Sequence, residues 1–119
     1  MKNFIKSLGF AIQGIGKTIE TEANFKTHLV MAFIVVVSGV ILSVSILEWI
    51  AILILIGLVL SAELMNTAIE LLADEVSMKY NNRIKKAKDA MAGAVLILSV
   101  FAAIIGLIIF TPKILNLIL

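Results

Sequence analysis

Three long stretches of this chain are almost free of charged side chains. They cover residues 29–47, 49–72 and 90–111, and polar or charged residues bound each of them. A helix needs about 20 apolar residues to cross the hydrocarbon core of a bilayer, and each stretch provides roughly that number. The pattern predicts three membrane-spanning helices, joined by one short turn and one longer, charged connection.

Residues 1–27 follow a different pattern, in which polar and apolar side chains alternate with helical spacing. One face of this helix would carry only apolar side chains, namely those of Phe4, Leu8, Ala11, Ile12, Ile15 and Ile19. Lysines and other polar residues lie away from that face, as in amphipathic helices that rest on a membrane surface beside anionic head groups. The same pattern fits a helix packed on the other helices, and the two arrangements are compatible.

Composition narrows the class of protein. Of the 119 residues, 61% are hydrophobic and 15% are charged, which is more apolar than an ordinary soluble domain. The chain has no cysteine and one histidine, so disulfides, thiolate chemistry and the usual zinc sites are excluded. No internal repeat or linker-like segment divides it. We therefore expect residues 1–119 to form a single all-α integral membrane domain.

The basic residues are distributed unevenly between the two sides of the membrane that these spans define. Lys113 lies on one side, and the other nine lie on the opposite side: Lys2, Lys6, Lys17, Lys26, Lys79, Arg83, Lys85, Lys86 and Lys88. Cytoplasmic segments of membrane proteins are enriched in Lys and Arg. The N-terminus and the connection 75–88 are therefore predicted to be cytoplasmic, and the C-terminus to lie outside.

The second span ends in a polar stripe. Read as a continuous helix, it places five polar side chains on one narrow face: Glu63, Asn66, Thr67, Glu70 and Asp74. Carboxylates are costly on a membrane helix unless they meet a cation, a cavity or water, so they indicate a functional site. Taken alone, the position of Glu63 is equally consistent with a structural carboxylate that pairs with a lysine inside the bundle.

The predicted topology brings polar residues of three segments to the cytoplasmic boundary. They come from the start of the first span, the end of the second and the start of the third: Glu22, Glu63, Asn66, Glu70, Lys88 and Asp89. Paired carboxylates suit a hard cation such as Mg²⁺, and lysines suit phosphate groups, so the combination indicates a metal-bridged nucleotide. We expect His28, in the same layer, to be an interfacial side chain rather than a ligand.

Two other classes of function fit parts of the pattern. A small ion or proton-coupled transporter would use Glu63 and Glu70 as cation-binding or relay groups. The acids cluster at one boundary instead of the midplane, and no inverted repeat is visible in the sequence, which disfavours a transporter. A non-catalytic assembly protein would need only packing surfaces and would leave the polar stripe without a role.

Two blocks of the sequence resemble the signature of the prokaryotic diacylglycerol kinase family of small membrane lipid kinases. They are Glu63-Leu64-Met65-Asn66-Thr67-Ala68-Ile69-Glu70 with Asp74, and Ala87-Lys88-Asp89-Ala90-Met91-Ala92-Gly93-Ala94-Val95. The similarity extends over nearly the whole chain, with the same spacing between the blocks. Within the family, the segments 22–28, 48–49 and 110–113 are most similar to the Gram-positive-type branch that phosphorylates undecaprenol.

The resemblance implies an assembly and a reaction. The expected assembly is a homotrimer with three spans and a surface helix in each subunit, and with shared active sites at the cytoplasmic boundary of a bacterial plasma membrane. The expected reaction is phosphorylation of the hydroxyl of a lipid alcohol by ATP with Mg²⁺. Undecaprenol is the preferred expected acceptor, diacylglycerol is the second, and no nucleic-acid partner is expected.

The resemblance also implies roles for individual residues. Glu63 matches the proposed general base of the family, and Glu22 and Glu70 match its metal-binding carboxylates. The positions expected around the nucleotide are Lys6, Gly9, Glu22, Asn66, Glu70, Lys88 and Asp89. Asn66 is expected beside Glu63 at the lipid substrate. Phe10 stands where some members carry a tyrosine, so a contact from that hydroxyl would be missing here.

Overall fold

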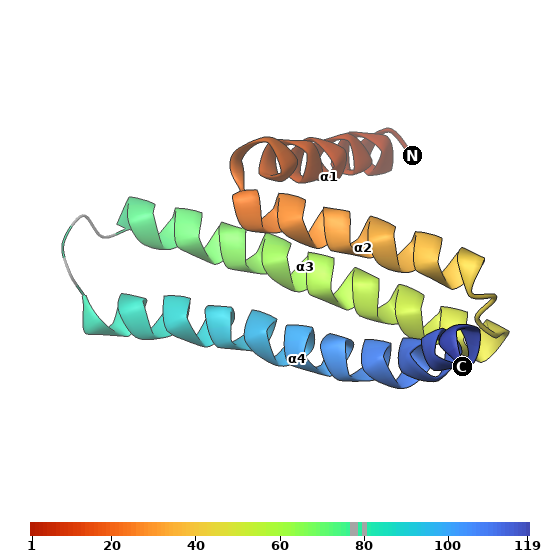
Figure 1. The fold of residues 1–119 in the computed structure, drawn as a ribbon. Helices are drawn as coiled ribbons and strands as arrows, with labels where there is room; N and C mark the ends of the chain where they lie inside the picture. Colours follow the sequence, from red (N-terminus) through yellow and green to blue (C-terminus); the bar gives the residue numbers. More distant parts are fainter. Residues whose placement is uncertain (77–78, 80) are drawn as a thin grey trace.

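Four helices make up the described part of the chain in the computed structural model, which covers residues 1–76, 79 and 81–119. In order they are α1 (Lys2–Thr21), α2 (Ala23–Ile41), α3 (Ile46–Val76) and α4 (Asn82–Ile118). Figure 1 shows α2, α3 and α4 side by side with α3 in the middle, and α1 on the outer side of α2. Residues 77, 78 and 80, which belong to the expected connection 75–88, lie outside the described residues.

The helices α2, α3 and α4 are each long and apolar enough to cross a membrane, as the sequence predicts. Their shared core is small: Val44, Ile52 and Ile109 are buried, with Trp49 among the partly buried neighbours. Most of their large apolar side chains point outward. Because lipid tails are as apolar as these side chains, an outward-facing apolar surface has no hydrophobic penalty in a bilayer. The architecture is therefore that of an all-helical membrane protein.

The first helix is shorter than the expected 1–27. Helix α1 ends at Thr21, Glu22 is extended with φ −110° and ψ 109°, and α2 begins at Ala23. Phe25 lies in the first turn of α2 and is only 2% exposed, so the chain must change direction before it to bury that ring. Periodicity alone gives no sign of the break, because polar residues continue at helical spacing on both sides of Glu22.

The turn between the first two spans lies earlier than expected. Helix α2 ends at Ile41, not at residue 47, and α3 begins at Ile46, not at residue 49. The cause is a capping box, in which Ser45 N–H donates to Glu48 Oε1 (2.9 Å) and Glu48 N–H donates to Ser45 Oγ (3.2 Å). These reciprocal bonds satisfy backbone donors at the helix start and fix where α3 begins.

Trp49 and Gly39 hold the two helices together beside this turn. A Cβ atom on Gly39 would lie 2.8 Å from the indole Cη2 of Trp49, which is too close for any side chain at that position. The absence of a side chain therefore lets the indole pack directly on the backbone of α2. Ser43, in the turn itself, has a φ of 55°, in the left-handed region.

Helix α4 extends well beyond the expected span 90–111 at both ends. It begins at Asn82, because the Asn81 side chain accepts hydrogen bonds from the N–H groups of Arg83 (2.9 Å) and Ile84 (3.3 Å). It also continues past Pro112 to Ile118. Figure 1 shows these last turns leaving the direction of the rest of α4, as expected where a proline removes one helical hydrogen bond.

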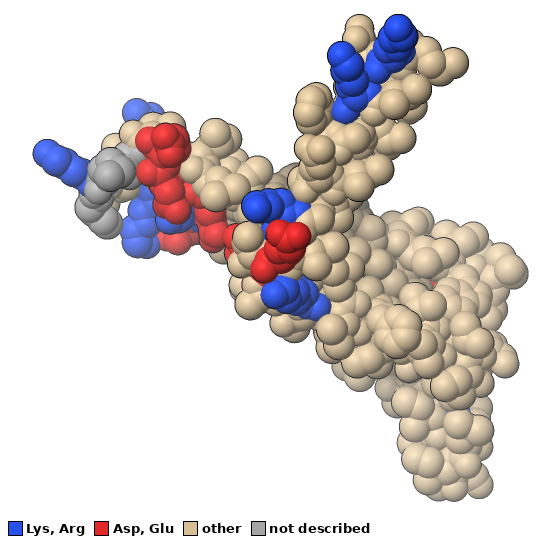
Figure 2. All heavy atoms as spheres, turned by 90° about the horizontal axis from the view of Figure 1, so that it is seen from above, with Lys and Arg blue, Asp and Glu red and all other residues tan. Residues whose placement is uncertain are grey.

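The bundle has two ends of different character. We call the end with the α2–α3 turn (42–45) and the last turns of α4 (112–118) the turn end. We call the opposite end, with Glu22, the second half of α3 (63–76) and the first turns of α4 (82–89), the polar end. Figure 2 shows that most acidic and basic side chains gather at the polar end and on α1, which projects as a separate arm.

Candidate active site

Glu63 is the buried carboxylate of the polar end. It is 4% exposed and lies on α3 in line with the apolar part of that helix. Its backbone carbonyl accepts a hydrogen bond from Thr67 Oγ1 at 3.1 Å, and Thr67 is also buried. A carboxylate removed from water needs a charged or hydrogen-bonding partner, because the desolvation of an isolated charge is costly.

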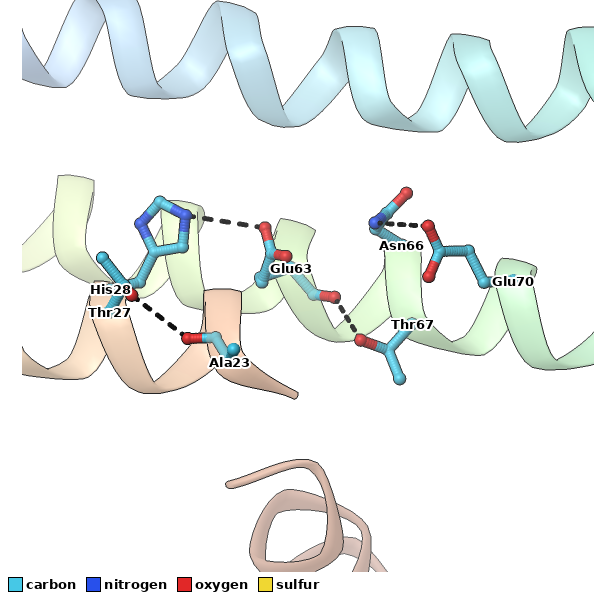
Figure 3. A network of polar contacts seen from close by, with 7 residues as sticks. All are labelled: Ala23, Thr27, His28, Glu63, Asn66, Thr67 and Glu70. Atoms are coloured by element: carbon cyan, nitrogen blue, oxygen red, sulfur yellow. Dashed lines mark hydrogen bonds and ion pairs between the residues drawn. The ribbon is translucent and has the colours of Figure 1, made fainter. Parts of the chain in front are cut away.

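The partner of the Glu63 carboxylate is His28 on the neighbouring helix α2. Its Nε2 lies 3.6 Å from Glu63 Oε2. Figure 3 shows the two side chains pointing toward each other from α2 and α3. From the sequence, His28 is expected in this layer as an interfacial side chain; in the structure it faces the buried carboxylate.

A sequence signal for this contact exists. In two antiparallel helices joined by a short turn, residues at similar distances from the turn lie side by side. Counted from the turn, His28 and Glu63 differ by about one helical turn. The topology thus brings the single histidine of the chain close to the first carboxylate of the stripe.

One turn further along α3, Asn66 and Glu70 contact each other. Asn66 Nδ2 donates to Glu70 Oε1 at 3.4 Å, a long hydrogen bond, and Figure 3 shows the two side chains facing each other. Asn66 Oδ1 is buried and has no hydrogen-bond partner among the described residues. Since buried polar atoms in folded proteins are nearly always satisfied, this oxygen is an available acceptor for a ligand.

The polar start of α4 contributes two ion pairs. Lys88 Nζ lies 3.4 Å from Asp74 Oδ1 and so links α4 to the end of α3. Asp89 accepts a 2.7 Å bond from Lys85 on its own helix, and both of these side chains are largely exposed. The structure therefore brings Lys88 toward the stripe on α3, whereas Asp89 is engaged at the surface.

The expected residues of α1 and the α1–α2 junction lie on a separate element. Lys6 is exposed and Gly9 is half-buried on α1. Glu22 is half-buried at the extended junction residue. Within the described part of the chain, no hydrogen bond or ion pair joins these side chains to the stripe on α3. The structure therefore does not assemble all the expected site residues around one point.

Among the described residues, no three His, Cys, Asp or Glu side chains form a cluster that would hold a metal ion by themselves. Mg²⁺ is commonly held by one or two carboxylates and completes its octahedral shell with water and substrate phosphates. Glu22 and Glu70, with the unpartnered Asn66 Oδ1, offer oxygen ligands of the kind that Mg²⁺ prefers. The donor set fits this ion when phosphate oxygens complete it.

An apolar cavity of about 330 Å³ lies between α2, α3 and α4. Its walls are almost entirely aliphatic or aromatic, and its polar lining residues are His28 and Ser99. Val59 and Leu60, one turn before Glu63 on α3, also line it. His28 thus borders the cavity on one side and the buried carboxylate on the other.

Comparison with known proteins identifies a family and several relatives of this chain. A model of the prokaryotic diacylglycerol kinase family matches residues 9–110. The undecaprenol kinase of Bacillus subtilis is 45% identical over 113 residues, which cover 95% of this chain and 92% of that protein. The diacylglycerol kinases of Synechocystis and Escherichia coli are 31% and 30% identical over 97% and 84% of this chain, and over 66% and 82% of their own lengths.

Proposed function

Because the chain belongs to the prokaryotic diacylglycerol kinase family and is a lipid kinase, we propose that it phosphorylates undecaprenol with ATP at the membrane boundary. Diacylglycerol is the proposed second acceptor. The chain is 45% identical to a protein named undecaprenol kinase and about 30% identical to proteins named diacylglycerol kinase, which supports this order. The relatives give no support to the transporter interpretation.

One observation carries the assignment of the site. The buried Glu63 carboxylate lies where an apolar cavity between the spans meets the polar end of the bundle. A lipid alcohol has the same division, with a long apolar tail and one hydroxyl at its end. A tail in the cavity would bring the hydroxyl to the level of Glu63, with the nucleotide on the polar side.

The proposed chemistry needs a base at the acceptor hydroxyl. The hydroxyl oxygen forms a bond to the γ-phosphorus, the bond from that phosphorus to the leaving oxygen of ADP breaks, and the hydroxyl proton passes to Glu63. Glu63 is the one buried carboxylate among the described residues, and its Oε1 forms no hydrogen bond or ion pair with any of them. A positioned base of this kind contributes about 10²- to 10⁴-fold to the rate.

Neighbouring residues would bind the nucleotide and orient the acceptor. Asn66 is proposed to lie beside the acceptor hydroxyl, with its buried Oδ1 accepting a hydrogen bond from a water molecule in the assembled site. Lys88 is proposed to turn from Asp74 toward the phosphates and to neutralise charge that develops during transfer. Lys6, Gly9 and Asp89 are proposed nucleotide contacts on the strength of the family resemblance.

Glu22 and Glu70 are the proposed ligands of Mg²⁺. When bound with ATP, the ion supplies positive charge to the phosphate oxygens and helps to align the γ-phosphate. Glu22 is the single extended residue between α1 and α2. Its binding to the ion would therefore also fix the direction in which α1 leaves the bundle.

The assembly and orientation are part of the proposal. We propose a homotrimer in the bacterial plasma membrane, with the polar end at the cytoplasmic side and α1 on the membrane surface. The exposed apolar side chains of α1 support this position, and they include Phe4, Ile5, Leu8 and Ile12. A helix with such a face and with lysines elsewhere binds anionic membrane surfaces. Sites shared between subunits would also supply neighbours to side chains that are half-exposed in one chain.

The deciding experiment measures transfer of labelled γ-phosphate from Mg-ATP to lipid in mixed micelles, with undecaprenol and diacylglycerol offered in parallel. Label in undecaprenol at the higher kcat/KM is the expected result. Faster labelling of diacylglycerol would reverse the order of acceptors. Label in neither lipid, with folded protein and magnesium present, would reject the proposed substrates, and ion flux in proteoliposomes would then be measured.

A further inference from the structure

The contact between His28 and Glu63 differs from every other ion pair among the described residues. Four other acids pair with lysines: Lys17 with Glu20, Lys85 with Asp89, Lys88 with Asp74 and Lys113 with Glu48. Those four pairs lie at half-exposed or exposed positions. The one deeply buried carboxylate is the one that faces an imidazole.

The choice of an imidazole has a chemical consequence. A lysine partner would hold a fixed positive charge beside Glu63 and would compete with a substrate hydroxyl for its oxygens. A histidine side chain keeps an N–H donor in the neutral and in the charged form, and it changes charge near neutral pH. It can therefore orient a carboxylate without holding that carboxylate permanently in a salt bridge.

The geometry separates the two oxygens of Glu63. His28 Nε2 faces Oε2 at 3.6 Å, which is longer than a hydrogen bond. Catalytic contacts of this kind are often long before the substrate binds. The contact leaves Oε1 as the oxygen that can accept a proton. Thr67, one turn along α3, bonds the Glu63 carbonyl and not the carboxylate.

His28 also lines the apolar cavity, together with Val59, Leu60 and other residues. Its ring therefore lies between the cavity and the base, at the point where a tail would end and a hydroxyl would begin. A side chain in this place affects both the direction of the carboxylate and the depth at which an acceptor stops.

We infer that His28 is the positioning residue of the general base: it holds Oε2 of Glu63, so that Oε1 points toward the hydroxyl of the lipid acceptor. This inference rests on the proposed function, in which Glu63 accepts the hydroxyl proton. His28 itself takes part in no bond-making step. It acts through the orientation of Glu63 and through its place in the lining of the cavity.

The test compares His28→Phe, His28→Gln and the matched control Thr27→Val. Phenylalanine keeps a ring of similar shape but has no donor, whereas the glutamine amide can donate to the same oxygen. Thr27 is the exposed neighbour of His28, and its hydroxyl donates only to the Ala23 carbonyl at 3.1 Å. Each variant is assayed for kcat and KM on a lipid alcohol and on its analogue with fluorine on the carbon next to the carbinol, which makes the hydroxyl more acidic.

We expect His28→Phe to lower kcat on the ordinary alcohol by about 30- to 100-fold, because a misaligned base loses part of its contribution to the rate. KM should change by less than about threefold. His28→Gln should retain kcat within about fivefold of the unsubstituted protein, and Thr27→Val within about twofold. The loss in His28→Phe should shrink by about tenfold on the fluorinated acceptor, because a more acidic hydroxyl depends less on an aligned base.

A merely structural role for His28 would lower kcat equally on both acceptors, and that result would overturn the inference. A change in KM alone would also overturn it. If His28→Phe elutes as an aggregate, His28→Leu takes its place with the same expectations. Glu63→Gln is assayed alongside: if it is inactive while His28→Phe is normal, only this inference fails. If Glu63→Gln is fully active, the proposed base itself fails.

Discussion

Both ends of the bundle contain carboxylates, but the hydrogen-bonding capacity of these carboxylates is satisfied to different degrees. At the turn end, Glu48 accepts bonds from the Ser45 N–H at 2.9 Å and from Lys113 Nζ at 2.8 Å. At the polar end, Glu63 has its partner at 3.6 Å, and Glu70 accepts a bond of 3.4 Å. The contacts of Glu48 are short, whereas those of Glu63 and Glu70, on the same helix, are long.

The difference separates a structural carboxylate from the proposed functional ones on a single helix. Glu48 and Glu63 both lie on α3, and sequence alone marks both as acids at the boundary of a membrane helix. The contacts of Glu48 join the turn to α4 and leave it little capacity for a ligand. The long contacts of Glu63 and Glu70, with the unpartnered Asn66 Oδ1, leave acceptors free for substrates.

The largest expected effect tests the polar end. Glu63→Gln should lower kcat for lipid phosphorylation by about 10³-fold, because the amide cannot accept the hydroxyl proton. The purified variant should retain the helical circular dichroism and the elution volume of the unsubstituted protein. Glu75→Gln, which changes an exposed carboxylate at the end of the same helix, is the control and should be active. Near-normal turnover in Glu63→Gln would show that Glu63 is not the base and that the two ends do not differ in function.

The second effect concerns the metal. Glu70→Gln should raise the Mg²⁺ concentration needed for half-maximal rate by about 10- to 100-fold or more. Changing a residue that only hydrogen-bonds to a metal ligand already weakens metal binding by that factor, and a direct ligand should matter at least as much. The measurement is a magnesium titration of kinase activity at saturating lipid. Glu22→Gln should behave in the same way. An unchanged magnesium requirement in both variants would show that the two carboxylates do not hold the ion.

The third effect tests the turn end. Lys113→Met removes the partner of Glu48 and should lower the temperature of thermal unfolding in detergent, because α4 beyond Pro112 loses its ion pair to α3. Specific activity of the folded fraction, measured below the transition, should be unchanged. A loss of activity without a loss of stability would contradict the separation of the two ends.

The smallest expected effect comes from the contact beside the turn. Gly39→Ala places a Cβ atom 2.8 Å from the indole of Trp49, so the ring or the helix must shift. Overpacking of this kind costs about 1–3 kcal/mol, and the better helix propensity of alanine returns about 1 kcal/mol, so a net loss of about 1 kcal/mol is expected. Gly57→Ala is the control, since no atom lies within 4 Å of its added Cβ atom. Equal unfolding temperatures for the two variants would count against the indole contact.

Hydrophobic pattern alone predicted the three spans and the continuity of α3 through the polar stripe. Long apolar runs permit few other structures in a chain of this size. The boundaries were less predictable. The break at Glu22 depends on the burial of Phe25, and the start of α3 depends on the bonds between Ser45 and Glu48. The spacing of a serine three residues before a glutamate was a usable signal for that second boundary.

The site was predictable in part. Glu63, Asn66 and Glu70 share a helix face, so their common position follows from helical geometry. The contact of His28 with Glu63 depends on how α2 and α3 pack, which a pattern along one helix does not contain. The roles of all the expected site residues stay predictions. In the described part of the chain, no hydrogen bond or ion pair joins Lys6, Glu22 or Asp89 to that face.

Because α3 is continuous, its length fixes the depth of Glu63 relative to the two faces of the membrane. From Ile46, fixed by its capping box, to Glu63 the helix rises about 26 Å, slightly less than the roughly 30 Å hydrocarbon core of a typical bilayer. The Glu63 carboxylate, the proposed base, is thus held a fixed distance from the opposite face of the membrane. In a thinner bilayer Glu63 would stand in the head groups, and in a thicker one it would sink among the tails. The enzyme would therefore work best in membranes whose acyl chains match this length.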